Sequence, residues 1–396
     1  MRQHLDPQQV DILREARKCI ADMGFLRMQR LPSLRRPLHL AGLEPSTLLA
    51  YWSGRTSPFT PTAFPGAYLT LFRGADTEAK DLYRFFFLNE TMPRRRLRET
   101  IGEELSGRLV SEGLAAEDRG YASFLYRLVP YGHTVFLTDR DQGANRTTEQ
   151  YVYAGGDSVL LARFVSGHLL DRSYERALDL CAGTAFQGHN VRGRAGSVLA
   201  AEYNRRAVEF ARATKRINDV GAGFEIVQSD LWENVSGDFD LVVSNPPYYP
   251  VPPEKRDQRI LDVFGGDRYG MEKPLRIIRG LDRHLRPGGA AAVLAASPVI
   301  GGKDLLAEEL RTPAEEIGLD IRLHAWKRTN IKLDMDYQVR EGIDYLIHYV
   351  IEAHRTGRGS VNIIPEPRPQ WTLETLNQRL SLLLYRTLHG GRASSG

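Results

Sequence analysis

The pattern of apolar and polar positions changes along the chain near residue 148. Between 148 and 355, short apolar runs alternate with amphipathic segments such as 204–219, the pattern of strands joined by helices in a parallel sheet. The predicted strands are 176–182, 197–203, 224–230, 239–245, 289–297, 320–328 and 345–354. Residues 148–355 are therefore predicted to form an α/β domain on a mostly parallel sheet of seven strands.

The first part of the chain, residues 1–147, has a mainly helical pattern. Apolar residues at helical spacing predict a helix over 9–22, and two further helices are predicted over 78–90 and 94–115. Two strand-like runs follow, 121–132 and 133–139. Helices followed by a two-stranded wing resemble a winged-helix module, so a helical, winged-helix-like N-terminal domain is expected.

The last part, residues 356–396, begins with Gly and Pro residues that are typical of a linker. An amphipathic helix is predicted over 372–388, with Thr372 as its N-cap. The tail after it is rich in Gly and Ser and is expected to be disordered.

Composition narrows the class of protein. The chain is 42% hydrophobic and 26% charged, which is ordinary for a soluble globular protein. No apolar run is long enough for a membrane span, and charged residues near the N-terminus argue against a signal peptide. The two cysteines, Cys19 and Cys181, have no metal-ligand spacing, so neither a disulfide framework nor a metal site is expected. A cytoplasmic protein is predicted.

The net charge of +4 is mild for 396 residues. Arg supplies most of the 53 basic residues, a bias that a GC-rich genome explains more readily than a nucleic-acid surface does. The Arg-rich run 94–98 is followed by compensating acids at 103 and 104. Charge alone therefore does not indicate a nucleic-acid partner.

Four successive predicted strands each end in residues suited to ligand binding. Ligands of open α/β sheets bind outside the carboxyl ends of the strands, so these residues are expected to meet in one site. In chain order they are Asp179 with the small-residue loop after it, Glu202, Asp230, and Asn245-Pro246-Pro247-Tyr248. Each element is weak alone, because small-residue turns and charged strand ends are common; the four in order form a strong signal.

The run Asn-Pro-Pro-Tyr at 245–248 directly follows a buried strand. Proline cannot donate to a sheet ladder, so the strand must stop there. The two prolines form a rigid turn that holds one amide side chain and one aromatic ring in fixed positions.

On these motifs, residues from about 150 to 350 resemble class I S-adenosylmethionine-dependent methyltransferases that carry Asn-Pro-Pro-Tyr. The Gly-Gly-Asp at 265–267, the helix after it and the turn at 285–289 are similar to release-factor glutamine N5-methyltransferases and guanine-N2 rRNA methyltransferases. The resemblance implies a Rossmann-like sheet and S-adenosylmethionine as the cofactor.

The resemblance also implies roles for single residues. Asp179 and Gly183 would line the methionine end of the cofactor, Glu202 would bind the ribose, and Asp230 would face the adenine. The other residues expected to contact the cofactor are Cys181, Ala182, Tyr203, Leu231 and Asn245. The family has glycine where this chain has Cys181 and Ala185; both replacements are small.

Asn245, Pro246 and Tyr248 are the residues that the resemblance places at the methyl acceptor. The Asn245 side chain and the Pro246 carbonyl would accept hydrogen bonds from an NH₂ group, and Tyr248 would pack on a planar group. Methyl transfer needs in-line geometry, so positioning supplies most of the catalysis. An N-methyltransferase acting on an amide, guanidine or amine of a peptide, protein or specialised metabolite is predicted.

Several alternatives remain open from the sequence alone. The enzyme could instead methylate rRNA or DNA bases, or the chain could be a non-catalytic regulator that senses S-adenosylmethionine. A homodimer is one option for its assembly. Residues 151–157, with Tyr151, Tyr153 and Asp157, could close the cofactor pocket or form a turn into a helix near Ser158. Tyr249 could line the site or cover the motif, and His189 is expected to be structural.

Overall fold

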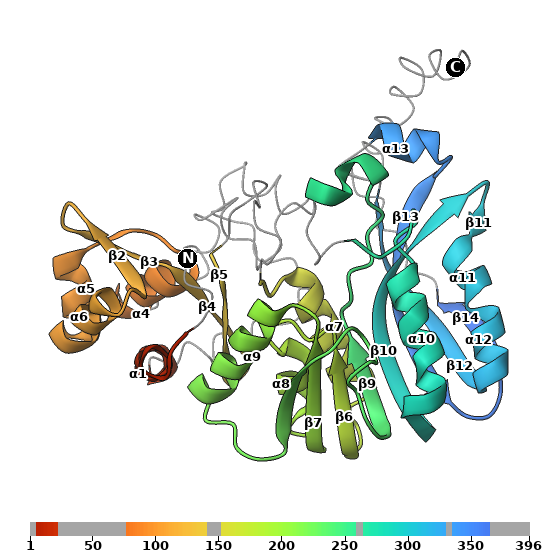
Figure 1. Ribbon diagram of the computed structural model, residues 1–396, viewed down its shortest axis with the longest axis horizontal. Coiled ribbons are helices and arrows are strands. Elements are labelled where there is room, and N and C mark those ends of the chain that lie inside the picture. The colour runs from red at the N-terminus through yellow and green to blue at the C-terminus, as the bar shows by residue number, and fades with distance from the viewer. Residues whose placement is uncertain (1–4, 23–76, 141–151, 259–263, 330–334, 365–396) are drawn as a thin grey trace, which may run out of the picture.

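The computed structural model describes residues 5–22, 77–140, 152–258, 264–329 and 335–364 (Figure 1). The predicted helix over 372–388, the tail after it and Tyr151 lie outside these residues. Among the residues described, no helix combines the length and the apolar character needed to cross a lipid bilayer.

A single sheet of nine strands forms the larger part of the molecule (Figure 1). Its order is β14-β12-β13-β10-β9-β6-β7-β8, with β11 paired to β10. The strands are β6 (Tyr174–Leu180), β7 (Ala195–Glu202), β8 (Phe224–Gln228), β9 (Phe239–Ser244), β10 (Leu285–Ile300), β11 (Lys303–Asp304), β12 (Leu319–Thr329), β13 (Tyr345–Arg355) and β14 (Ser360–Ile364). All seven predicted strands are present, and β13 runs antiparallel to both its neighbours. The predicted Rossmann-like, mostly parallel sheet is confirmed.

The sheet has two strands more than predicted. β14 lies in the segment that was predicted to be a linker and pairs in parallel with β12. The Gly-rich run before it is a tight turn in which the backbone N–H groups of Thr356 and Gly357 both donate to the Gly318 carbonyl. Gly and Pro content therefore marked a turn between two strands here, and not the end of the domain.

Helices cover both faces of this sheet, because alternate residues of each central strand point to opposite sides. Leu178 of β6 and Val242 of β9 pack against α10, α11 and α12, whereas Ala177 and Leu241 pack against α7, α8 and α9. These helices are α7 (Gly156–His168), α8 (Phe186–Val191), α9 (Arg205–Ile217), α10 (Glu272–His284), α11 (Leu305–Glu309) and α12 (Arg311–Ile317). Two short helices complete this part, η4 (Pro253–Gln258) and α13 (Met335–Arg340).

The described residues of the N-terminal part, 5–22 and 77–140, form more helix than strand. Its elements are α1 (Pro7–Asp22), α4 (Thr77–Leu82), the π-helical turn η3 (Tyr83–Phe87), β1 (Met92–Pro93), α5 (Arg94–Ile101), α6 (Glu103–Ser111), β2 (Ala115–Asp118) and β3 (Tyr121–Phe124). The helix predicted over 94–115 is two helices, because Gly102 between them has a φ of +85°.

The two strands predicted as a wing, 121–132 and 133–139, pair with each other as predicted over 126–131 and 134–139, whereas residues 121–124 pair elsewhere. Residues 121–124 form β3, which pairs with β2 and β1 in a three-stranded sheet. A separate hairpin follows, made of β4 (Tyr126–Tyr131) and β5 (Thr134–Asp139). β2 was missed because three of its four residues are exposed, which leaves no apolar alternation in the sequence.

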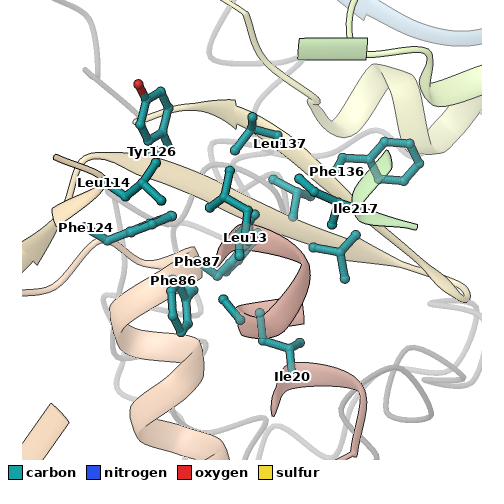
Figure 2. Packing of buried hydrophobic residues seen from close by; sticks show 14 of the residues in the cluster. Leu13, Ile20, Phe86, Phe87, Leu114, Phe124, Tyr126, Phe136, Leu137 and Ile217 are labelled. Carbon is teal, nitrogen blue, oxygen red and sulfur yellow. The ribbon is translucent and has the colours of Figure 1, made fainter. Parts of the chain in front are cut away.

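The β4–β5 hairpin joins the N-terminal part to the sheet domain through one apolar core (Figure 2). Leu13 of α1, Phe86 and Phe124 belong to the same buried cluster as Leu137 of β5 and Ile217 of α9. The Tyr126 ring also meets the Phe210 ring of α9, with centroids 5.9 Å apart. Because this core is continuous, the two parts are expected to unfold together.

Replacing Ile217 with valine is expected to lower the free energy of unfolding by about 1 kcal/mol, because Ile217 is fully buried in the shared core. Urea unfolding followed by circular dichroism checks this value. Ile363→Val is the control, since Ile363 is 49% exposed and its change should be within about 0.5 kcal/mol of zero. An early partial transition in Ile217→Val, with the sheet domain still folded, would contradict a shared core.

Candidate active site

A pocket of about 460 Å³ lies at the carboxyl ends of β6, β7, β8 and β9. The chain leaves β6 to one side for β7 and β8 and returns on its other side as β9, so the pocket lies at the point where the strand order reverses. All the predicted site residues line it: Asp179, Cys181, Ala182, Gly183, Glu202, Tyr203, Asp230, Leu231, Asn245, Pro246 and Tyr248.

The loop after β6 lines one side of the pocket with backbone that side chains do not cover. Cys181, Gly183 and Ala185 have φ angles of +58°, +56° and +62°, in the left-handed region. Cys181 and Ala185 thus adopt the backbone conformation for which glycine is preferred. A Cβ built on Gly183 would meet no atom within 4 Å. A ligand can therefore approach the loop backbone at Gly183.

Glu202 fixes the shape of this loop. One of its carboxylate oxygens accepts the Gly183 N–H at 2.7 Å, and the other accepts the Asn204 N–H at 2.7 Å. Each oxygen keeps a further lone pair for a ligand hydroxyl. Burial raises the pKa of Glu202 above its ordinary value.

Asp179 is buried at the end of β6, beneath the loop. Its Oδ2 accepts the Gly188 N–H of α8 at 2.7 Å. Burial raises the pKa of Asp179 well above its ordinary value, and the charge of Glu202 adds to the shift. The pocket thus holds two desolvated carboxyl groups, a set of acceptors suited to a cation with hydroxyl and ammonium donors.

Binding of the sulfonium cofactor implied by the sequence is expected to weaken as the pH falls through the raised pKa values of Asp179 and Glu202, because protonation removes negative charge from the pocket. The effect of these two groups on folding has the opposite sign. The folded state binds their protons more tightly, so acidification towards pH about 4 favours it. Calorimetric titration with S-adenosylmethionine at a series of pH values down to about 4 checks the predicted weakening of binding. It is carried out on the wild type and on Asp179→Asn. An equal pH slope in both proteins would contradict a role for Asp179.

Beyond Glu202, the pocket opens towards the ends of β7 and β8. The Tyr203 side chain is 54% exposed at this opening. Ser229 anchors the next turn, because its N–H donates to the Glu202 carbonyl at 2.9 Å and its Oγ donates to the Leu231 carbonyl at 2.7 Å. Asp230 and Leu231 thereby lie in one wall opposite the loop.

Asn245 is held at the end of β9 by neighbours on both sides. Ser244 Oγ donates to the Leu180 carbonyl at 2.6 Å, which fixes the strand end against β6. Asn245 Nδ2 donates to Ser158 Oγ at 3.3 Å. This contact uses the amide nitrogen and leaves Oδ1 as an acceptor for a ligand NH₂ group. Burial raises the pKa of Tyr248 well above its ordinary value, so its phenol stays neutral.

The segment before α7 lines the pocket and also leads into a helix, so the two alternatives from the sequence do not exclude each other. Val152, Tyr153, Asp157 and Ser158 line the pocket, and α7 begins at Gly156. Tyr249 likewise lines the pocket and forms a bridge with Phe264.

His189 does not line the pocket. It is buried between Phe136 and Phe224, with ring centroids at 5.4 and 4.7 Å. Burial lowers its pKa to about 3, so the ring is neutral. These features agree with the structural role expected for it.

Sequence reasoning missed two cations near the start of α10. Lys273 and Arg276 line the pocket, and Lys273 Nζ donates to the Phe264 carbonyl at 2.9 Å. Burial lowers the pKa of Lys273. Their spacing of three residues at a helix start was the available signal. Other lining residues missed are Phe186, Gln187, Asn204, Ala207 and Ser229, whereas Thr184 belongs to the predicted small-residue loop.

Residues 152–261 match the model of the methyltransferase small domain. A putative protein N5-glutamine methyltransferase of Methanocaldococcus jannaschii is 29% identical over 43% of this chain and 89% of its own length. The release factor glutamine methyltransferase of Bifidobacterium longum is 27% identical over 56% of this chain and 77% of its own. The ribosomal RNA small subunit methyltransferase C of Chromohalobacter salexigens is 33% identical, over 28% of this chain and 30% of its own length.

Proposed function

We propose that this chain, a methyltransferase that uses S-adenosylmethionine, methylates the side-chain amide nitrogen of a glutamine in a protein. The predicted reaction class and methyl donor are confirmed by the match of residues 152–261 and by the relatives. Two relatives named for glutamine methylation align over most of their length, which supports the choice of acceptor.

The single observation that carries the proposal is the position of Asn245 in the pocket. Its amide nitrogen is engaged by Ser158, so its oxygen is the group left to accept from an acceptor NH₂. The Pro246 carbonyl is proposed to take the second N–H, and Tyr248 to pack on the planar amide. Together these contacts would hold the nitrogen in line with the methyl group that the cofactor supplies.

The proposed cofactor contacts follow from the pocket walls. Asp179 and the bare loop backbone at Gly183 would hold the methionine end, Glu202 and Tyr203 the ribose, and Asp230 and Leu231 the adenine. The pocket volume of about 460 Å³ lies within the range of about 300–1,000 Å³ usual for small-molecule sites. The loop, the two desolvated carboxyls and the volume fit such a ligand.

A second proposal concerns the N-terminal part, which we infer to be a winged-helix-like module. Its support is the order of elements, helices α5 and α6 followed by the β2–β3 hairpin, with β1 completing the small sheet. The Arg residues of α5 face carboxylates: Arg94 contacts Glu117 at 2.8 Å, and Arg96 contacts Asp81 at 2.6 Å. This neutralised surface favours a protein acceptor over the rRNA alternative.

The test is transfer from methyl-labelled S-adenosylmethionine into an extract of the source cells, separated into protein, nucleic-acid and small-molecule fractions. We expect label in the protein fraction, with the mass of one methyl group added to a glutamine side chain. Purified release factor, with single glutamines replaced by glutamate, then identifies the position.

Asn245→Ala is the control for background transfer. Label in RNA or DNA would replace this proposal with base methylation, and label in small molecules with a metabolite acceptor. Binding of S-adenosylmethionine without transfer to any fraction would support the non-catalytic sensor. Homodimerisation stays a prediction, which light scattering of the purified protein checks.

A further inference from the structure

Strand β5 contacts two residues that line the pocket and a third, Arg206, that lies between lining residues, although β5 belongs to the N-terminal part of the sequence. The Leu137 carbonyl accepts from Thr184 Oγ1 of the loop at 2.9 Å. Asp139 exchanges two bonds with Val152: its N–H donates to the Val152 carbonyl at 2.8 Å, and its Oδ2 accepts the Val152 N–H at 2.9 Å. Thr184 and Val152 both line the pocket. Asp139 also pairs with Arg206, which lies between the lining residues 204 and 207.

One edge of β5 is paired with helix side chains instead of another strand. The Asn218 side chain donates to the Val135 carbonyl at 2.8 Å and accepts the Val135 N–H at 2.9 Å. Thr214 Oγ1 accepts the Leu137 N–H at 3.1 Å and contacts Thr184 Oγ1 at 2.9 Å. Residues 206, 210, 214 and 218 repeat every four positions, so they form one stripe along α9 and its C-cap residue, Asn218. This stripe satisfies backbone groups that burial would otherwise leave unpaired.

The Asp139–Arg206 pair fixes the end of β5 nearest the pocket. Both residues are buried, with 3% and 8% of their surface exposed. The Arg206 guanidinium also lies over the Phe210 ring, 4.5 Å from its centroid. A buried ion pair that loses one partner leaves an uncompensated charge, so these two groups hold each other in place.

We propose that β5 is a positioning strand of the cofactor site, in which Asp139 and Leu137 hold the segment at Val152, the loop at Thr184 and the start of α9 in register. Cofactor binding and docking of the β4–β5 hairpin on α9 then stabilise each other, because coupling between two equilibria is reciprocal. This inference rests on the proposed cofactor site and gives the N-terminal part a function in it.

The first test compares three full-length variants by calorimetric titration with S-adenosylmethionine. Asp139→Asn and Thr214→Val each remove a contact that reaches a pocket wall. Asn218→Ala removes contacts of the same stripe with Val135, the Thr214 carbonyl and Arg17, none of which lines the pocket. We expect Kd to rise about tenfold in the first two variants and less than about threefold in the third. Equal changes in all three would overturn the inference, because β5 would then act only through overall stability.

The second test uses the wild-type protein, so it does not depend on the folding of any variant. Hydrogen exchange is measured at the Leu137 and Asp139 amides with and without S-adenosylmethionine. We expect saturation with the ligand to slow exchange at these amides by about tenfold, with amides of the β2–β3 hairpin unchanged. If S-adenosylmethionine binds but exchange at the 137 and 139 amides is unchanged, the inference is overturned and the proposed cofactor site is not affected. Absence of binding by the wild type would instead overturn the proposed cofactor site, and the inference with it.

Discussion

Asn245→Ala is expected to lower kcat for methyl transfer by about 10²–10³-fold, while the Kd for S-adenosylmethionine changes by less than about tenfold. The Asn245 oxygen is the fixed acceptor proposed for the substrate NH₂ group, and the turn at Pro246 and Pro247 cannot move to replace it. An acceptor without this hydrogen bond would rotate away from the line of attack. Single-turnover transfer with saturating cofactor measures the effect.

Two further variants test whether the loss arises from this contact. Ser158→Ala removes the hydroxyl that accepts from Asn245 Nδ2 at 3.3 Å. It should produce a smaller loss, about tenfold, because the Asn245 oxygen is still present. Asn362→Ala, on exposed β14, should leave kcat unchanged. If kcat for methyl transfer falls by less than about threefold in Asn245→Ala, groups other than Asn245 position the acceptor.

Glu202→Gln is expected to weaken S-adenosylmethionine binding by about 100-fold, or about 2.7 kcal/mol. Both carboxylate oxygens accept backbone N–H groups, from Gly183 and Asn204. A glutamine has one oxygen and one NH₂ group, so one of these N–H donors would face another donor. The loop at Gly183 would then lose its shape, and the negative charge opposite the cofactor would be lost as well.

Isothermal titration of the Glu202→Gln protein measures this change. Glu225→Gln is the matched control, because it makes the same chemical change at an exposed position of β8 outside the pocket. Thermal unfolding of both proteins without ligand separates a binding effect from a folding effect. A Kd within about threefold of wild type would show that the loop keeps its shape without the carboxylate.

The sheet could be predicted because its buried strands contain continuous apolar runs, such as 290–296, separated by helical segments. β14 could not, because Ile363 and Ile364 are exposed and the turn before it has a linker's composition. The hairpin β4–β5 was visible as two apolar runs, but its packing was not. It docks through hydrogen bonds from Thr214 and Asn218, and such partners carry no periodic signal in a sequence.

The site was predictable where its residues end strands, because parallel strands bring their carboxyl ends to one edge. Asp179, Glu202, Asp230 and Asn245 meet in one pocket for this reason. Lys273 and Arg276 reach the same pocket from the start of α10. Their approach depends on how α10 packs on the sheet, and no local sequence pattern indicates this.

The left-handed conformations at Cys181 and Ala185 restrict which sequences can form this loop. Any non-glycine residue there costs about 1–2 kcal/mol, and a β-branched side chain is a conformational outlier. Glycine could replace either residue without moving the backbone, whereas valine or threonine could not. Loop geometry, and not glycine itself, is therefore what selection must preserve. A search pattern that requires glycine at both positions would therefore pass over this chain, whereas one that admits small unbranched residues would find it.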